Sequence, residues 1–420
     1  MMECFNRVRP RARLTRHGEP ASIESQRPPV HRPGAGGGTP LGATMKRLVL
    51  ACVVFLAPAL AAQQPSTDAP YKVLKADRVG GEGGWDYLFA DPVGRRLYIP
   101  RGGTPGARAT DSTPARPGGP GRIMVYNLDN LDSVGAVMES GGNGAVVDPK
   151  SGHGFSSSRP EITMFDTKTL TVLKRIPIDS GFGPDGILFD HFNERVYIFS
   201  HPTKDAMVID ARDGTVLGRV DLGGPPEQAV SDGHGKLYVI IQDTASVTVV
   251  DTKAMKAIEH FPFRDKGGCN GLALDDKNHV LFAACSGGPR APGRGGPPAA
   301  TPGVPPTMTM LNANDGTVLA TLPLVGGSDG MVFNPSTMEA FSTGGGTLTV
   351  VKETAPRSFV IEENLSTMAG SRTITFDPNT GHIFTMSQDR GPAPPAPAGG
   401  GRGGFAPAIP GSFTILMIGR

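Results

Sequence analysis

The chain has 420 residues and a formal net charge of +2 at pH 7, with 58 glycines and 40 prolines. Residues 1–62 contain nine of the 41 basic residues but only three of the 39 acidic ones, so the rest has 32 basic and 36 acidic residues and a net charge of −4. This balance argues against strong non-specific binding to nucleic acid or to an anionic membrane.

The first 62 residues have the pattern of a leader. A basic region opens at Met45, residues 48–60 are apolar, and Ala59 and Ala61 are the small residues that precede a cleavage site. Residues 45–62 therefore predict a signal peptide and a periplasmic or extracellular protein, since an apolar run this short does not span a bilayer comfortably. We interpret residues 1–44, which are rich in Arg and Pro, as a misassigned or disordered upstream segment.

Seven short apolar strands in the remaining chain each end on Asp or Asn. Four of the six gaps between successive ends are 42 or 43 residues, and the other two, of 57 and 59 residues, each contain a Pro/Gly-rich insert. A repeat of this length is typical of a β-propeller with four strands per blade. Residues 63–420 therefore predict an all-β, seven-bladed propeller. The seven ends are Asp91, Asp148, Asp190, Asp232, Asp275, Asn334 and Asp377.

The third repeat shows the blade most plainly. We expect its strands at residues 186–190, 195–199, 206–210 and 215–220, with Asp213-Gly214 in the last hairpin turn. The Asp and Asn residues at strand ends are expected to be structural, because their short side chains accept hydrogen bonds from the next turn. The last repeat is one strand short, so residues 71–74 are expected to supply its outer strand and close the ring, which removes exposed strand edges.

Three Gly/Pro/Arg-rich inserts interrupt the repeats between the second and third strands of blades one, five and seven. They comprise residues 101–121, 286–306 and 389–411, and we expect them to be disordered. In a four-stranded blade this loop lies on the same face as the blade-to-blade crossovers. The inserts are then either tolerated surface insertions or a mobile cover over the channel mouth.

The repeated pattern of strand, Asp-Pro, strand and Val-Ile-Asp turn contains the segments Val196-Tyr197-Ile198 and Leu237-Tyr238-Val239. Over about residues 71–420 it resembles the YncE-like family of secreted seven-bladed propellers with YVTN-type repeats, although blades two, six and seven depart from the repeat. The resemblance implies a periplasmic or surface protein without an established reaction. Nucleic-acid binding is suggested for some members of that family.

A polar residue stands five positions before each of the seven strand ends, where the innermost strand should begin at the mouth of the channel. We call these residues the mouth ring. Carboxylate and amide oxygens that converge there would suit Ca²⁺ or Mg²⁺, would equally hold a cationic small molecule, or are simply the polar residues of a solvated channel mouth. The mouth ring comprises Asp86, Asn143, Asp185, Glu227, Asn270, Asp329 and Arg372.

Arg372 predicts an ion pair with one of the ring acids rather than an open ring of metal ligands. His201 is expected on the same rim, as a candidate base or an ordinary exposed residue. His153, His234 and His279 fall in turns expected on the opposite face. Trp85, the single tryptophan, precedes Asp86 and is expected either to stack on a ligand or to pack between blades one and seven; Tyr87 and Tyr98 belong to the same blade.

Cys269 and Cys285 flank a hairpin whose turn is centred on residue 277. Antiparallel strands joined there place the two cysteines opposite each other, and an exported protein meets an oxidising environment. We therefore predict a disulfide, with two buried thiols as the alternative.

Three functions are compatible with these features. The favoured one is a non-catalytic scaffold, expected to be a monomer, that binds a small molecule or a protein at the channel mouth. The second is a metal-dependent hydrolase or lyase of the lactonase-like propeller kind, which requires a general base near the metal. Single-stranded nucleic-acid binding is the third, and the net charge of −4 counts against it.

Overall fold

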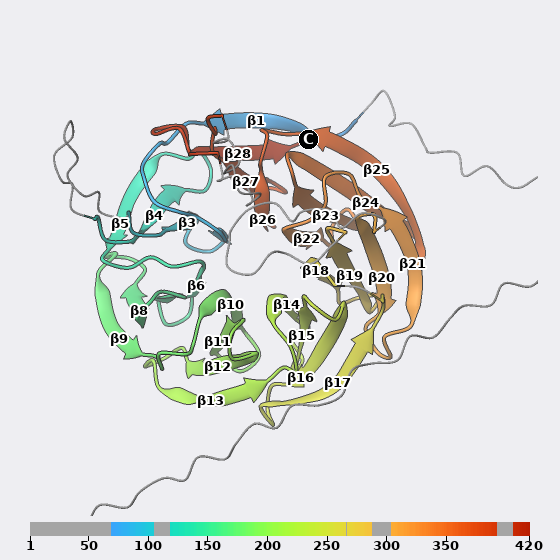
Figure 1. Ribbon diagram of the computed structural model, residues 1–420, viewed down its shortest axis with the longest axis horizontal. Coiled ribbons are helices and arrows are strands. Elements are labelled where there is room, and N and C mark those ends of the chain that lie inside the picture. Colours follow the sequence, from blue (N-terminus) through green and yellow to red (C-terminus); the bar gives the residue numbers. More distant parts are fainter. Residues whose placement is uncertain (1–68, 105–117, 266, 288–303, 393–405) are drawn as a thin grey trace, which may run out of the picture. The chain divides into compact units, whose positions relative to one another are not determined.

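The computed structural model describes residues 69–104, 118–265, 267–287, 304–392 and 406–420. These form one compact unit of seven four-stranded antiparallel sheets arranged as a propeller (Figure 1), as the repeat predicts. The predicted leader and most of each insert lie outside the described residues. Among the described residues there is no helix long and apolar enough to cross a membrane.

Each of the first four blades runs from the innermost to the outermost strand in chain order. Blade one has β2 (Phe89–Asp91), β3 (Arg96–Arg101), β4 (Arg122–Asn127) and β5 (Ser133–Met138). Blade two has β6 (Ala145–Asp148), β7 (His153–Ser156), β8 (Glu161–Asp166) and β9 (Val172–Pro177). Blade three has β10 (Pro184–Asp190), β11 (Arg195–Ser200), β12 (Asp205–Asp210) and β13 (Val216–Asp221). Blade four has β14 (Pro226–Ser231), β15 (Lys236–Ile241), β16 (Ser246–Asp251) and β17 (Lys256–Pro262).

Blades five and six follow the same order, and blade seven takes its outer strand from the start of the described chain. Blade five has β18 (Cys269–Asp275), β19 (Val280–Cys285), β20 (Thr307–Asn312) and β21 (Val318–Pro323). Blade six has β22 (Gly330–Asn334), β23 (Glu339–Gly344), β24 (Thr347–Ala355) and β25 (Ser358–Ser366). Blade seven has β26 (Arg372–Phe376), β27 (Ile383–Ser387), β28 (Thr414–Gly419) and β1 (Lys72–Asp77).

Burial follows the position of a strand in its blade. The second strands are almost entirely buried, because neighbouring blades cover both faces, and β19 is accordingly a continuous apolar run. Outermost strands such as β13 expose much of their length to solvent. The apolar core therefore lies between adjacent blades, and the cluster around Leu97, Phe384 and Phe413 joins blades one and seven.

The Asp and Asn residues at strand ends have the structural role that we expected. Asp91 Oδ1 accepts hydrogen bonds from the backbone N–H groups of Val93 and Gly94. Asp251 at the end of a third strand accepts equivalent bonds from Lys253 and Ala254. Each turn thus receives a side-chain acceptor for otherwise unpaired backbone donors, which explains why these residues recur with the repeat.

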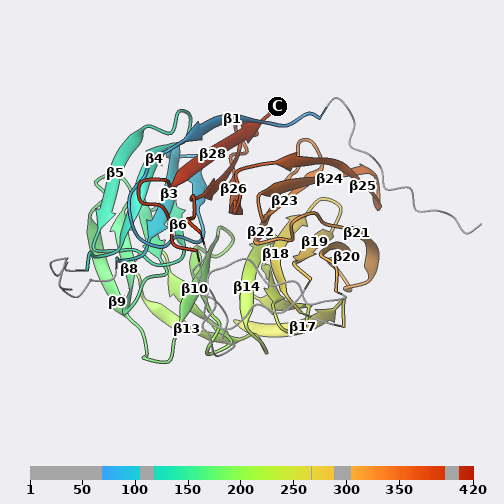
Figure 2. The same cartoon turned by 45° about the horizontal axis from the view of Figure 1, so that its top comes forward.

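The ring is closed by the predicted pairing of the two ends of the propeller. β1 lies antiparallel to β28, with Lys72 opposite Gly419, and Figures 1 and 2 both show the two strands side by side. Tyr71 extends the closure to blade six, because its hydroxyl donates to Glu339 Oε2 at 2.6 Å and its backbone N–H donates to Glu363. Arg420 also pairs with the buried Glu339 carboxylate.

A second closure joins blades seven and one. Arg95, just before β3, donates to both carboxylate oxygens of Asp377, at 2.9 and 2.8 Å. Burial acts to raise the pKa of Asp377, but the hydrogen bonds from Arg95 and from Thr380 outweigh it and hold the pKa below its ordinary value. Asp377 is therefore an anion that is fully buried and bidentately paired.

The positions of two residues differ from the sequence expectation. Arg101 is the last residue of β3, so the first insert begins after it. Its guanidinium is buried over the Phe413 ring at 3.8 Å and donates to backbone carbonyls of the loop before β2, which places it in the junction between blades one and seven. His153 is the first residue of β7 rather than part of the preceding turn, and its Nδ1 contacts the Ala211 carbonyl of the next blade.

We predict that Asp377→Asn lowers the free energy of unfolding by about 2 kcal/mol, because it removes the charge of a buried, hydrogen-bonded pair. Asp129→Asn is the matched control: Asp129 contacts the same arginine, but its side chain is 54% exposed, so a loss below about 1 kcal/mol is expected. Urea unfolding of both variants measures this. Equal losses would mean that burial of the pair does not matter.

The same pair predicts an acid dependence. Because the pKa of Asp377 is lower in the folded chain than its ordinary value of 3.8, its contribution to stability is complete above about pH 4 and is lost as pH falls through the folded-state pKa. The difference in melting temperature between wild type and Asp377→Asn should therefore shrink as pH falls below about 4. A difference independent of pH would contradict this.

Cys269, the first residue of β18, is opposite Cys285, the last residue of β19. The two form the predicted disulfide. Their sequence separation of 16 residues implies a stabilisation of about 3 kcal/mol from the restricted unfolded chain. We predict that non-reducing peptide mapping finds the two residues linked, and that Cys269→Ala/Cys285→Ala lowers the free energy of unfolding by about that amount. Recovery of both as free thiols from oxidised protein would contradict the prediction.

Candidate functional site

The fold gathers the mouth ring at one end of the channel, because the seven innermost strands all begin there. Asp185, Glu227 and Asn270 are the second residues of β10, β14 and β18, and Arg372 is the first of β26. We had expected the innermost strands to begin at the mouth-ring residues, but Asp86, Asn143 and Asp329 stand before their strands. They still point into the same network, because the chain approaches the channel through these residues.

Direct hydrogen bonds connect neighbouring members of the mouth ring. Asn143 Nδ2 donates to Asp185 Oδ1 at 2.6 Å, which joins blades two and three. Asn270 Nδ2 donates to Asp329 Oδ1 at 3.1 Å, which joins blades five and six. The amides of the ring therefore serve as donors to its carboxylates.

Arg372 links blades six, seven and one, as the predicted internal ion pair. Its Nη1 lies 3.1 Å from Asp329 Oδ2 and 3.5 Å from Asp86 Oδ1, and its Nη2 donates to the Trp85 carbonyl at 2.8 Å. The guanidinium also lies 4.5 Å from the centre of the Trp85 ring. Trp85 packs against Phe413 of blade seven as well, and so it has the contacts of the packing alternative.

His201 connects blades three and four. It follows β11 and places its Nε2 3.2 Å from Asp185 Oδ2 and 3.4 Å from Glu227 Oε1. The Glu227 side chain is only 4% exposed, whereas that of His201 is 31% exposed. Among the described residues, one group of three or more His, Cys, Asp or Glu side chains could hold a metal ion. It consists of Asp185, His201 and Glu227.

Two further residues complete the circle, and the sequence analysis did not assign them to it. Gln242 Nε2 donates to Glu227 Oε1 and, at 3.1 Å, to Asn270 Oδ1, which joins blades four and five. The Tyr87 N–H donates to the Asn143 carbonyl at 2.9 Å, which joins blades one and two. Every blade is thus linked to both neighbours at the channel mouth.

A positional signal for Gln242 exists in the repeat. Gln242 follows the second strand of its blade, as His201 does in blade three and Gln388 in blade seven. Gln388 Oε1 accepts from the Trp85 indole N–H at 3.3 Å. In these three blades the residue after the second strand therefore faces the same mouth as the mouth ring. A search of that second position in the repeat would have found these polar side chains.

The pKa of Tyr87 reflects the negative electrostatic potential at the channel mouth. Its hydroxyl donates to Glu227 Oε2 at 3.3 Å. Burial, and then the nearby carboxylates of Glu227, Asp185, Asp86 and Asp329, raise the pKa of Tyr87 well above its ordinary value of 10.0. Four ring acids that all act on one phenol form a region suited to a cationic group.

Two cavities open beside the mouth ring on the face from which the inserts leave the blades. One, of about 540 Å³, is bordered by Trp85 and Arg372 of the ring region and by Gln388 and Arg390 of blade seven. The other, of about 660 Å³, is bordered by Asn143 and Pro184. Gly103 borders both, so the cavities adjoin at the base of the first insert.

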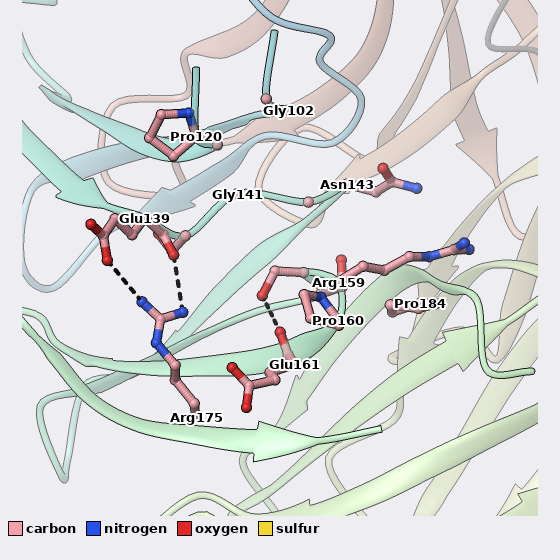
Figure 3. Close-up of a pocket in the computed structure, with 16 residues that line it drawn as sticks. Gly102, Pro120, Glu139, Gly141, Asn143, Arg159, Pro160, Glu161, Arg175 and Pro184 are labelled. Atoms are coloured by element: carbon pink, nitrogen blue, oxygen red, sulfur yellow. Dashed lines mark hydrogen bonds and ion pairs between the residues drawn. The ribbon is translucent and has the colours of Figure 1, made fainter. Parts of the chain in front are cut away.

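Charged side chains line the larger cavity (Figure 3). Arg175 Nη1 donates to the Glu139 carbonyl at 3.0 Å, and its Nη2 lies 3.6 Å from the Glu139 carboxylate. Figure 3 shows the Arg159 side chain extending past Pro184, on the same side of the cavity as Asn143. The mouth ring is acidic, whereas the larger cavity beside it is lined by the Arg159 guanidinium. The site therefore presents charges of both signs.

His234 and His279 lie in the first-to-second strand turns, at the end of the blades away from the mouth ring, as expected. His234 follows β14 and contacts Asp276 of blade five, with Nε2 3.4 Å from Oδ2. The structure thus contains a second His–carboxylate pair that is remote from the channel mouth.

The propeller is similar to solved WD40 structures. The WD40 domain of Neurospora crassa Pan2 gives a TM-score of 0.59 at 10% sequence identity, over 85% of this chain and 98% of that domain. A chain of the crystal structure of the mitotic checkpoint complex gives a TM-score of 0.58 at 12% identity, over 80% of this chain and 96% of the other. Identities this low show the fold alone.

No protein-family model matches the sequence, and no curated protein matches it. The resemblance to the YncE-like family therefore stays a prediction.

The raised pKa values of the tyrosines predict how the native protein behaves at alkaline pH. Burial is the largest cause of a raised pKa in all six, and it raises those of Tyr98 and Tyr238 to about 12. Near pH 11, phenolate absorbance should stay low in the folded protein and be nearly complete in the denatured chain. Because the folded-state pKa values are raised, the stability that they contribute falls as pH rises above about 10. Ionisation of several tyrosines near pH 11 with unchanged circular dichroism would contradict this.

Proposed function

We propose that the protein is a non-catalytic binding propeller of the periplasm or cell surface, and that its ligand binds at the mouth ring. The observation that carries this is the continuous polar network at the channel mouth, to which all seven blades contribute and beside which two cavities open. A site held by seven sheets is rigid, and rigid preorganised sites lose little entropy when a ligand binds. The signal-peptide pattern of residues 45–62 supports export.

The charges favour a ligand with a cationic group. Four carboxylates surround the mouth, and Arg372 pairs with Asp86 and Asp329. An ammonium or guanidinium group could approach the Asp185 side of the mouth, while the rest of the ligand occupies an adjoining cavity. Such a ligand is either a small polar molecule or a basic segment of a protein.

The comparisons support the protein-binding form of this proposal. One similar propeller belongs to the mitotic checkpoint complex, a protein assembly. The shared architecture supports a scaffold in which loops on one face of a rigid ring contact the partner. The resemblance to YncE-like propellers supports the same role outside the cytoplasm.

A metal-dependent hydrolase or lyase of the lactonase-like kind is the second candidate. One observation favours it: His201 lies within 3.4 Å of carboxylate oxygens of both Asp185 and Glu227. A metal held there could polarise a carbonyl or activate water. This candidate requires turnover of a lactone or ester, which the binding proposal does not.

The binding proposal is tested with Asp185→Asn, which removes one mouth charge on the side that the cationic group would approach and keeps the side-chain shape. Spermidine, choline, arginine and arginine dipeptides are titrated in EDTA and followed by thermal shift and calorimetry. We expect at least one compound to bind wild type about tenfold more tightly than the variant, the equivalent of about 1.4 kcal/mol. Asp276→Asn, an acid remote from the mouth, is the control and should bind as wild type does. Equal affinity of all three proteins would place the ligand elsewhere.

A further inference from the structure

We infer that Asp185, His201 and Glu227 form a binding site for one divalent transition-metal ion of the Zn²⁺, Mn²⁺ or Fe²⁺ class. The site lies at the junction of blades three and four and is one sector of the channel mouth. This inference adds a metal to the proposed binding site, and the proposed ligand binding does not depend on it.

Adjacent strands position the three side chains. Pro184 of β10 pairs with Ser200 of β11 at the mouth end of blade three, so Asp185 and His201, which are next to these paired residues in the chain, both lie near that end. Glu227 occupies the corresponding position in β14 of blade four. Groups at strand ends of packed blades keep their separation better than groups on long loops, which a metal site requires.

The separations are those of atoms that share a metal. Two ligand atoms about 2.1 Å from one ion are about 3.0 Å apart at a right angle and about 3.4 Å apart at the tetrahedral angle. His201 Nε2 lies 3.2 Å from Asp185 Oδ2 and 3.4 Å from Glu227 Oε1. The three ligand atoms all lie within 4.8 Å of one another. Small side-chain rotations would bring them around a common centre.

The direction of the His201 ring supports a metal over an ordinary hydrogen bond. Its Nε2 is buried and has no hydrogen-bond partner, although two carboxylate oxygens lie within 3.4 Å. Neither oxygen is therefore placed to accept a proton from Nε2. A buried ring nitrogen without a hydrogen-bond partner is costly, and coordination of an ion by its lone pair removes that cost.

The surrounding hydrogen bonds would orient the ligands. Asn143 donates to Asp185 Oδ1 and leaves Oδ2 facing His201. Gln242 and Tyr87 donate to the two oxygens of Glu227. Such outer partners hold ligating carboxylates in place in known metal sites.

The donor set selects the class of ion. Ca²⁺ and Mg²⁺, one of the alternatives that the sequence left open for the mouth ring, prefer oxygen ligands throughout. One imidazole nitrogen among three protein ligands favours Zn²⁺, Fe²⁺ or Mn²⁺ instead.

Metal binding to the mature chain, residues 63–420, tests the inference without any assay of activity. The protein is stripped with a chelator, and Mn²⁺, Zn²⁺ and Ca²⁺ are each titrated by calorimetry. Pulsed electron paramagnetic resonance of bound Mn²⁺ then reports a directly coordinated nitrogen. We expect one ion per chain, a nitrogen coupling in wild type, and loss of that coupling with at least about 100-fold weaker binding in His201→Gln.

The matched control is His234→Gln, which alters the other histidine that lies beside a carboxylate, and it should bind metal as wild type does. Thermal melts of the stripped proteins show whether His201→Gln is folded, and Asp185→Asn is a second variant with the same expected loss. Absence of stoichiometric binding to wild type, unchanged affinity in His201→Gln, or tighter binding of Ca²⁺ than of Mn²⁺ would each overturn the inference. The ligand titrations above are done in EDTA, so their outcome is independent of this one.

Discussion

The pairing of β1 with β28 is the constraint on which the rest of the structure depends. An open row of seven blades would leave two sheet faces and a strand edge without partners. Closure instead gives every blade two neighbours, so the second strands are buried on both faces and can be continuous apolar runs. The Arg95–Asp377 pair and the contacts of Tyr71 with Glu339 reinforce the same junction.

Closure also creates the candidate site. When seven equivalent strands begin around one axis, their first polar side chains come together from distant parts of the sequence, as Arg372 and Asp86 do. Such a cluster of carboxylates needs hydrogen-bond donors. Around the mouth these are side-chain amides, the Arg372 guanidinium and the Tyr87 hydroxyl. The sector of Asp185, His201 and Glu227 differs from the others because an imidazole stands between two carboxylates there.

Much of the fold could be predicted from the sequence because the repeat is a local signal. The strand-end Asp and Asn residues recur for a local reason, the capping of each turn, and so they reveal the number of blades. The last repeat, which is one strand short, indicated the closing strand, and the hairpin centred on residue 277 indicated the Cys269–Cys285 pairing. The site was predicted less fully. Asp185 and His201 could be placed on one rim, but the role of Gln242 depends on how blade four packs against blade five, which no spacing within one repeat encodes.

The closing pair has a consequence for the order in which the chain folds. Lys72 meets Gly419, so this contact spans nearly the entire propeller, whereas the strands of the other six blades pair within short segments. Contacts between distant residues form slowly, since a large loop must be closed first. The strand that is synthesised first among those described must therefore wait for the last one, and β1 remains without its sheet partner until β28 has been synthesised.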